Sequence, residues 1–192
     1  MPYNRDRHHR HSIRLRGYDY RSPGVYFVTL CTHQRQNLFG VVRDGVMQPN
    51  DFGRVVAALW SRIPEHDPRI RLDAFQVMPN HVHGLIEIVG LDGQACSWTA
   101  PGSGDGSGPE HPRGPAPGSL GAVLGSFKSA STRRINAIRR VQGAPLWQRN
   151  YWEHIIRNAD EYERIYTYVI SNPALWADDE LYTPDETDLS PQ

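Results

Sequence analysis

The hydrophobic positions of the chain form two kinds of pattern, short apolar runs and stretches with helical spacing. The run Gly24–His33 (GVYFVTLCTH) is rich in β-branched and aromatic residues, which favours a buried strand. The same criteria predict further strands over Ile70–Val77, Val82–Val89 and Tyr151–Ile156. Between Asn37 and Met47 the chain is rich in turn residues, and a short hairpin is expected around Asp44-Gly45.

Three segments carry apolar residues at helical spacing. One helix begins after Asn50 or Asp51, both good N-cap residues, and is expected to run to about Glu65. Two more are predicted over Leu120–Arg140 and Asp160–Ser171. The order of elements favours an α+β fold, a ferredoxin-like or RRM-like (RNA-recognition-motif-like) sandwich. Such a fold has an antiparallel sheet with helices on one face, and here a C-terminal helix follows.

Composition divides the 192 residues into one domain and three less regular parts. Residues 1–22 are expected to form a flexible basic arm, residues 23–176 a single domain, and residues 177–192 an acidic tail. Residues 91–118 are dominated by Gly, Pro and Ser, so we expect a disordered insertion within the domain.

The composition also excludes several classes of protein. No stretch approaches about 18 apolar residues, so no membrane span and no membrane partner are expected. The basic N-terminus lacks an apolar core for secretion, and Cys31 and Cys96 cannot build a disulfide framework. These features favour a cytoplasmic protein.

The formal net charge of zero conceals segregated charges. Lys128 is the single lysine among 21 basic residues, and arginine is the side chain that binds phosphates in a planar, bidentate way. Residues 119–150 contain six basic residues and no acid. Such blocks point to a polyanionic partner, although solvated arginines that keep the protein soluble would give the same pattern.

The sharpest chemical signal is Pro79-Asn80-His81-Val82-His83 at the start of a predicted strand. Side chains alternate along a strand, so both imidazoles project from one face. Two neutral imidazoles on one face make half of a divalent metal site. The alternative is a pair of ordinary polar residues on a half-exposed strand.

A second signal lies on the last predicted helix. Tyr168 and Asn172 are four residues apart and stack on one edge of the helix. The inward face is predicted to hold Tyr162, Ile165, Tyr166 and Val169. From the helix alone, aromatic packing for Tyr168 and helix capping for Asn172 remain open.

Together, the blocks PNHVHGLIEI, GSFKSASTRRIN and LWQRNYWEHIIRNADEYERIYTYVISNP resemble the IS200-like transposase family. The chain is most similar to the branch of REP-associated tyrosine transposases, and the resemblance covers most of Gly24–Trp176. It implies that His81 and His83 form the HUH metal pair, that Tyr168 is the nucleophile and that Asn172 is the third ligand. Tyr166, turned toward the core, is the less favoured nucleophile.

The resemblance also implies an activity. A divalent metal, Mg²⁺ or Mn²⁺, would assist nicking and strand transfer of single-stranded DNA at hairpin-flanked sites, through a 5′-phosphotyrosine. The matched stretch contains Lys128, Arg133 and Arg134, and we expect these residues, with Arg10, Arg14 and Arg16 of the arm, to bind DNA. Family members differ in whether one subunit or two complete the site, so monomer and homodimer both stay open.

Other functions are compatible with parts of the pattern. A non-catalytic RRM-like nucleic-acid-binding module would keep the fold and lose the chemistry. A histidine-triad hydrolase would need a longer alternating histidine run, and Leu85 stands at the next alternate position. A metal-dependent amidohydrolase would need further Asp or His ligands near the pair, and none stands out in the sequence.

Overall fold

The computed structural model describes residues 18–90 and 115–184. Its main sheet is antiparallel and four-stranded, in the order β4-β5-β1-β6. These strands are β1 (Gly24–Cys31), β4 (Ile70–Val77), β5 (His81–Ile88) and β6 (Trp152–Ile156). A separate hairpin pairs β2 (Gly40–Arg43) with β3 (Val46–Pro49). The helices are α1 (Asp51–Ser61), α2 (Leu120–Arg139) and α3 (Ala159–Ser171).

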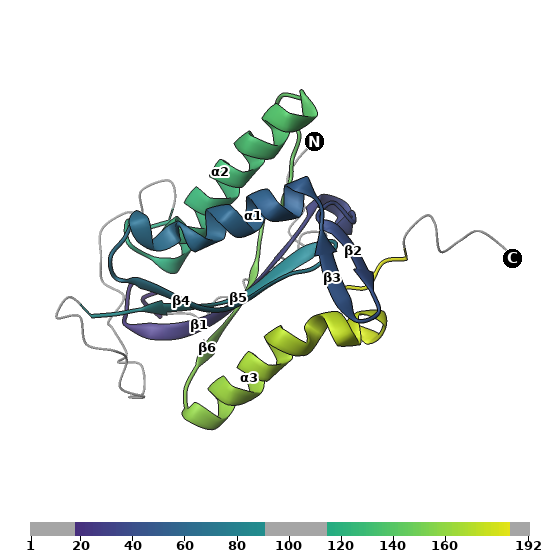
Figure 1. Ribbon diagram of the computed structural model, residues 1–192. Coiled ribbons are helices and arrows are strands. Elements are labelled where there is room, and N and C mark those ends of the chain that lie inside the picture. Colours follow the sequence, from purple (N-terminus) through teal and green to yellow (C-terminus); the bar gives the residue numbers. More distant parts are fainter. Residues whose placement is uncertain (1–17, 91–114, 185–192) are drawn as a thin grey trace, which may run out of the picture.

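The strand order confirms the predicted ferredoxin-like topology, and the helices lie on both faces of the sheet. Helices α1 and α2 lie together on one face, while α3 crosses the other (Figure 1). Alternate residues of β1 serve the two sides: Tyr26 and Val28 join the core under α1 and α2, whereas Val25 and Phe27 join the core under α3. The predicted α+β class is therefore confirmed, with α3 forming a third layer.

Capping, proline and turn residues explain where most helices and strands begin or end. The Asn50 side chain caps α1 by accepting hydrogen bonds from the backbone N–H groups of Phe52 and Gly53. The expectation that this helix reaches Glu65 was wrong, because α1 ends at Ser61 and a short 3-10 turn, η2 (Ile63–Glu65), follows. Pro64 has no N–H for another α-helical turn. The hairpin turn at Asp44-Gly45 is confirmed, with φ of 51° and 72°.

Both ends of the described chain return to the domain. Tyr20, which the sequence assigned to the basic arm, packs against the core, and its carbonyl accepts a hydrogen bond from the Leu120 N–H. After α3, a 3-10 helix, η3 (Asn172–Asp178), leads into residues 179–184, which lie against the sheet end. Residues 91–114 of the expected insertion lie outside the described residues. In the described ranges no helix has the length and apolar character to cross a bilayer.

Candidate metal and nucleophile site

His81 and His83 project from the α3 side of β5 and are buried, with exposed fractions of 0% and 2%. Their Nε2 atoms are 3.0 Å apart. The prediction that the two imidazoles share a face is therefore confirmed. The sheet register places Thr29 of β1 beside His83.

Neighbouring polar groups orient both rings. Asn80 donates through Nδ2 to the Leu181 carbonyl at 2.7 Å and to the Thr183 hydroxyl at 2.9 Å, which fixes its amide and turns its Oδ1 toward His81. Oδ1 accepts from Nδ1–H of His81 at 2.8 Å, so Nε2 of that ring carries the lone pair. The Thr29 hydroxyl lies 2.8 Å from Nδ1 of His83, and a hydroxyl can donate or accept there.

Burial keeps the two histidines neutral. It lowers the pKa of His81 to about 3, against a smaller opposing effect of the neighbouring Asn172 amide. Burial, followed by the proximity of His81, places the pKa of His83 well below its ordinary value. Neutral imidazoles are the form that binds metal ions, so both rings are in the ligating state at neutral pH.

Asp179 completes a group of three that could hold a metal ion. One ligand atom from each of His81, His83 and Asp179 lies within 4.8 Å of the others. The carboxylate accepts from Asn172 Nδ2 and from the Leu181 N–H, both at 2.7 Å. Sequence analysis missed Asp179 because it lies in the segment assigned to the acidic tail. The apolar pair Leu175-Trp176 was the available signal, since Trp176 is buried and keeps this segment packed.

Asn172, the residue that the resemblance implies as third ligand, lies beside this group. It is 1% exposed, and its Oδ1 is buried with no hydrogen-bond partner in the described part of the chain. A buried carbonyl oxygen without a partner is costly unless something else satisfies it. Two imidazoles, one carboxylate and one amide oxygen form a donor set that fits a divalent cation.

The Tyr168 side chain reaches the same group from α3. Its hydroxyl lies 3.4 Å from Nε2 of His83, and its ring packs edge-on against Phe27. Burial raises the pKa of Tyr168 to about 12, and the nearby Asp179 carboxylate adds to this rise. The predicted inward position of Tyr166 was wrong: its side chain is 37% exposed and its ring neighbours Tyr162 instead.

His83 lines a cavity of about 770 Å³, beside Tyr168 and Asn172. Part of its lining comes from the C-terminal segment, including Asp178, Asp179 and Glu180. Another part comes from the segment before β6 and from β6 itself, and its members are Gln148, Asn150, Tyr151 and Trp152.

Two of the predicted DNA-binding residues, Arg133 and Arg134, lie away from this cavity. Arg133 and Arg134 are exposed on α2, on the other side of the sheet. Lys128 donates to the carbonyls of Gln148 at 2.6 Å and Arg149 at 2.9 Å, and burial lowers its pKa. The arm residues Arg10, Arg14 and Arg16 lie outside the described residues.

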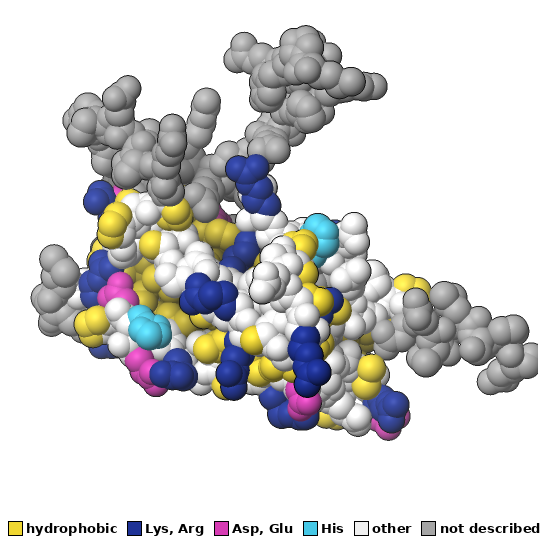
Figure 2. Space-filling model, turned by 90° about the horizontal axis from the view of Figure 1, so that it is seen from above, with side chains coloured by type: hydrophobic (Ala, Val, Ile, Leu, Met, Phe, Trp, Pro, Cys, Tyr) yellow, Lys and Arg dark blue, Asp and Glu magenta, His cyan; other side chains and the backbone are white. Residues whose placement is uncertain are grey.

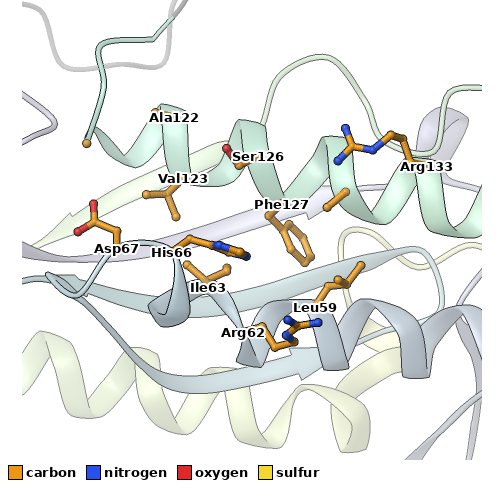
Figure 3. A pocket seen from close by; sticks show the side chains of 12 residues that line it. Leu59, Arg62, Ile63, His66, Asp67, Ala122, Val123, Ser126, Phe127 and Arg133 are labelled. Carbon is orange, nitrogen blue, oxygen red and sulfur yellow. The ribbon is translucent and has the colours of Figure 1, made fainter.

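A groove of about 640 Å³ runs between α1 and α2 (Figure 3). Its lining is apolar at Ile63, Val123 and Phe127, and the side chains of Arg62 and Arg133 extend along its rim. Seen from above the two helices, this face carries Lys and Arg side chains spread around the apolar hollow, with fewer acidic groups (Figure 2). The face is therefore suited to an anionic partner, while the histidine pair lies on the opposite side of the sheet.

Comparison with known proteins gives one extensive sequence match. A Haemophilus influenzae protein, described only as an uncharacterized protein, is 39% identical over 180 residues, which are 94% of this chain and 97% of that protein. No family model matches the chain. A solved REP-associated tyrosine transposase bound to a REP hairpin is 18% identical, with a TM-score of 0.48 over 85% of this chain and 73% of that one. A candidate transposase from Deinococcus radiodurans is also 18% identical, with a TM-score of 0.44 over 83% and 96% of the two chains.

Proposed function

This chain belongs to the same protein family as the Haemophilus influenzae protein, and we propose that it is a metal-dependent enzyme that nicks and joins single-stranded DNA. The proposed substrate is a strand flanked by a hairpin, and the proposed intermediate is a 5′-phosphotyrosine on Tyr168. The observation that carries the proposal is the Tyr168 hydroxyl, 3.4 Å from Nε2 of a buried, neutral histidine pair. A nucleophile beside a metal-ligating pair is what phosphodiester cleavage needs.

His81, His83 and Asp179 would hold the ion, with the unpartnered Oδ1 of Asn172 as a further ligand. The ion, Mg²⁺ or Mn²⁺, would supply charge neutralisation at the phosphate oxygens. Asn80 keeps Nε2 of His81 unprotonated and directed at the site.

Tyr168 carries the covalent step. Its hydroxyl oxygen attacks phosphorus, the P–O bond to the 3′ oxygen breaks, and the products are a 5′-phosphotyrosine and a free 3′ hydroxyl. The phenolic proton passes to the neighbouring Asp179 carboxylate and from there to the leaving 3′ oxygen, so the step releases no net proton. Attack by another 3′ hydroxyl reverses the step and joins two strands without an external energy source.

Binding of the hairpin is assigned to the basic face of α1 and α2. Arg133 and Arg134 are exposed there and would contact backbone phosphates, with Arg10, Arg14 and Arg16 of the arm as further contacts. Lys128 uses two of its three N–H donors on backbone carbonyls, so we assign it to holding the segment before β6. The protein would act as a monomer or a homodimer.

A non-catalytic nucleic-acid-binding module is the second candidate, because one observation favours it. The negative charges of Asp179 and Glu180 contribute to the raised pKa of Tyr168, and a tyrosine with a pKa of about 12 is a weak nucleophile at neutral pH. A divalent cation at the histidine pair would oppose these charges, so the two candidates differ in their response to metal.

The nucleophile is tested by the variants Tyr168→Phe and Tyr166→Phe. Wild-type protein incubated with single-stranded hairpin DNA and Mn²⁺ should give a covalent adduct that survives denaturing gel electrophoresis. Tyr168→Phe should give none and bind the DNA normally, because only one oxygen is lost. Tyr166→Phe should still form the adduct. No wild-type adduct on any hairpin strand, with Mg²⁺ or Mn²⁺, would favour the binding module.

A further inference from the structure

A row of side chains leads from the histidine pair to the edge of the sheet. The register pairs His83 of β5 with Thr29 of β1, and Thr29 with Trp152 of β6, so the three side chains share the α3 face. Two strand spacings, about 10 Å in all, separate the first residue from the last. This is comparable with the reach from a phosphate to the base of its own nucleotide.

Trp152 at the end of this row is exposed and held in a fixed orientation. Its side chain is 45% exposed, although the ring packs edge-on against Phe27 with centroids 5.3 Å apart. The ring is also nearly parallel to that of His154, at 8° and 5.9 Å. An indole that is braced by its neighbours yet lines a cavity is a ready stacking surface for a planar ligand.

The segment before β6 adds amide groups to the same wall. Gln148 and Asn150 line the cavity beside Trp152, and neither side-chain amide hydrogen-bonds to another described residue. The backbone of this segment is held in place by hydrogen bonds. The Gln148 N–H donates to the Cys31 carbonyl at 2.9 Å, and Lys128 donates to the carbonyls of Gln148 and Arg149. Amides offer paired donors and acceptors, which match the edges of nucleobases.

The lining residues of the cavity differ in charge. Gln148, Asn150 and Trp152 are uncharged, whereas the C-terminal segment contributes acidic residues such as Asp178 and Glu180, and Arg35 adds one positive charge. An uncharged aromatic and amide surface suits a base, whereas the cation-binding group beside it suits the phosphate.

We propose that Gln148, Asn150 and Trp152 form a base-recognition site for the unpaired nucleotide next to the phosphate that is cleaved. Trp152 stacks on the base, and the two amides read its edge. The proposal rests on the proposed function, because it takes the histidine pair as the position of the phosphate.

The test measures binding without cleavage, in Tyr168→Phe protein with the metal chelated. The probes are eight-nucleotide single strands of dT, dA or dC, and a strand of abasic residues of the same length. Trp152→Leu should weaken binding of the base-containing strands by about 5- to 150-fold and leave binding of the abasic strand unchanged. Trp152→Phe should retain most of the affinity. Tyr166→Leu, which removes another exposed aromatic ring that lies outside the cavity, should have no effect.

The role of the two side-chain amides is tested by the preference of the protein among the dA, dC and dT strands, and not by its affinity for one strand alone. Gln148→Ala and Asn150→Ala should change the ratio of affinities for dA, dC and dT, whereas a merely structural role would lower all three equally. Equal binding of dT by wild type and Trp152→Leu, or an equal loss on the abasic strand, would overturn the base site. The adduct assay on otherwise wild-type protein separates this result from failure of the proposed function, since adduct formation with normal Trp152→Leu binding rejects the base site alone.

Discussion

Burial of the neutral His81 and His83 side chains makes the folded protein less stable at acid pH. On unfolding, His81 returns from a pKa of about 3 to the ordinary value of 6.5, so the unfolded chain binds an additional proton between these values. Stability that is present above pH 6.5 is therefore lost as the pH falls toward 3. We expect His81 to account for a loss of about 2 kcal/mol between pH 7 and pH 5.

Urea unfolding of wild-type protein, His81→Gln and His66→Gln at the two pH values measures this loss. His81→Gln should show a smaller drop than wild type, because one of the protons is no longer taken up. His66→Gln is the control, because His66 is exposed and lies far from the histidine pair, and its stability drop should match that of wild type. An identical drop in all three proteins would contradict the prediction.

The hydroxyl of Thr29 orients His83 and should therefore tune metal binding. Thr29→Val keeps the shape and removes the group 2.8 Å from Nδ1, so affinity for Mn²⁺ should fall by about 10- to 100-fold. Thr32→Val is the matched control, because Thr32 is also buried but its hydroxyl donates to the Gln36 carbonyl. Titration calorimetry with Mn²⁺ should find near wild-type affinity for Thr32→Val, and equal affinities for the two variants would exclude the orienting role.

Residues whose positions follow from local periodicity could be predicted. Alternation along a strand placed His81 and His83 on one face. Asp179 could not be found this way, because it follows a 3-10 helix and is positioned by hydrogen bonds such as those of Asn172 and Leu181. Tyr166 was placed inward because it fits the helical stripe, but α3 buries a narrower strip, with only Ile165 and Val169 buried in the helix.

At the scale of elements, Gly84 shows how the helical layer constrains β5, the strand that carries the histidine pair. Gly84 follows His83 on β5, and a Cβ there would overlap the ring of Trp60 from α1. Gly84→Ala must displace either the indole or the strand, so the free energy of unfolding should fall by about 1–3 kcal/mol. Gly125 of α2 has open space around the same position, so Gly125→Ala should raise it by about 0.5–1 kcal/mol.

Urea denaturation of the two alanine variants measures whether the free energy of unfolding falls in Gly84→Ala and rises in Gly125→Ala. Gly84→Ala should also lower Mn²⁺ affinity, because the displaced strand carries His83, whereas Gly125→Ala should bind the ion normally. A stabilised Gly84→Ala protein would mean that Trp60 repacks freely and that the contact does not constrain β5.

At the scale of the whole molecule, the order of the elements was predictable and the placement of α3 was not. The strand and helix patterns are local, and they lead directly to the ferredoxin-like order. Which face α3 covers depends on packing between distant segments. The signal was present in β1, where seven of the eight residues from Gly24 to Cys31 are buried, as expected for a strand covered on both sides.

The sheet separates two surfaces with different roles in the proposed function. The histidine pair and Trp152 lie on the α3 side, and the basic groove lies on the side of α1 and α2. DNA bound by the basic face must therefore pass around an edge of the sheet to reach Tyr168. Trp152 lies on β6, an edge strand, so this strand is the natural path for the unpaired flank.

The role of the basic face is tested by the salt dependence of hairpin binding. Each phosphate contact that is removed should reduce the slope of log affinity against log salt by about 1, so Arg133→Ala and Arg134→Ala should each have this effect. The loss should be similar for hairpins of different sequence, because phosphates carry no sequence information.

Arg54→Ala is the control: this exposed arginine of α1 is paired with Asp51 at 2.6 Å, and its removal should leave the slope unchanged. Binding of a hairpin oligonucleotide at several salt concentrations, measured by fluorescence anisotropy, supplies the slopes. An unchanged slope in the Arg133→Ala/Arg134→Ala double variant would show that the hairpin does not bind to this face of the molecule.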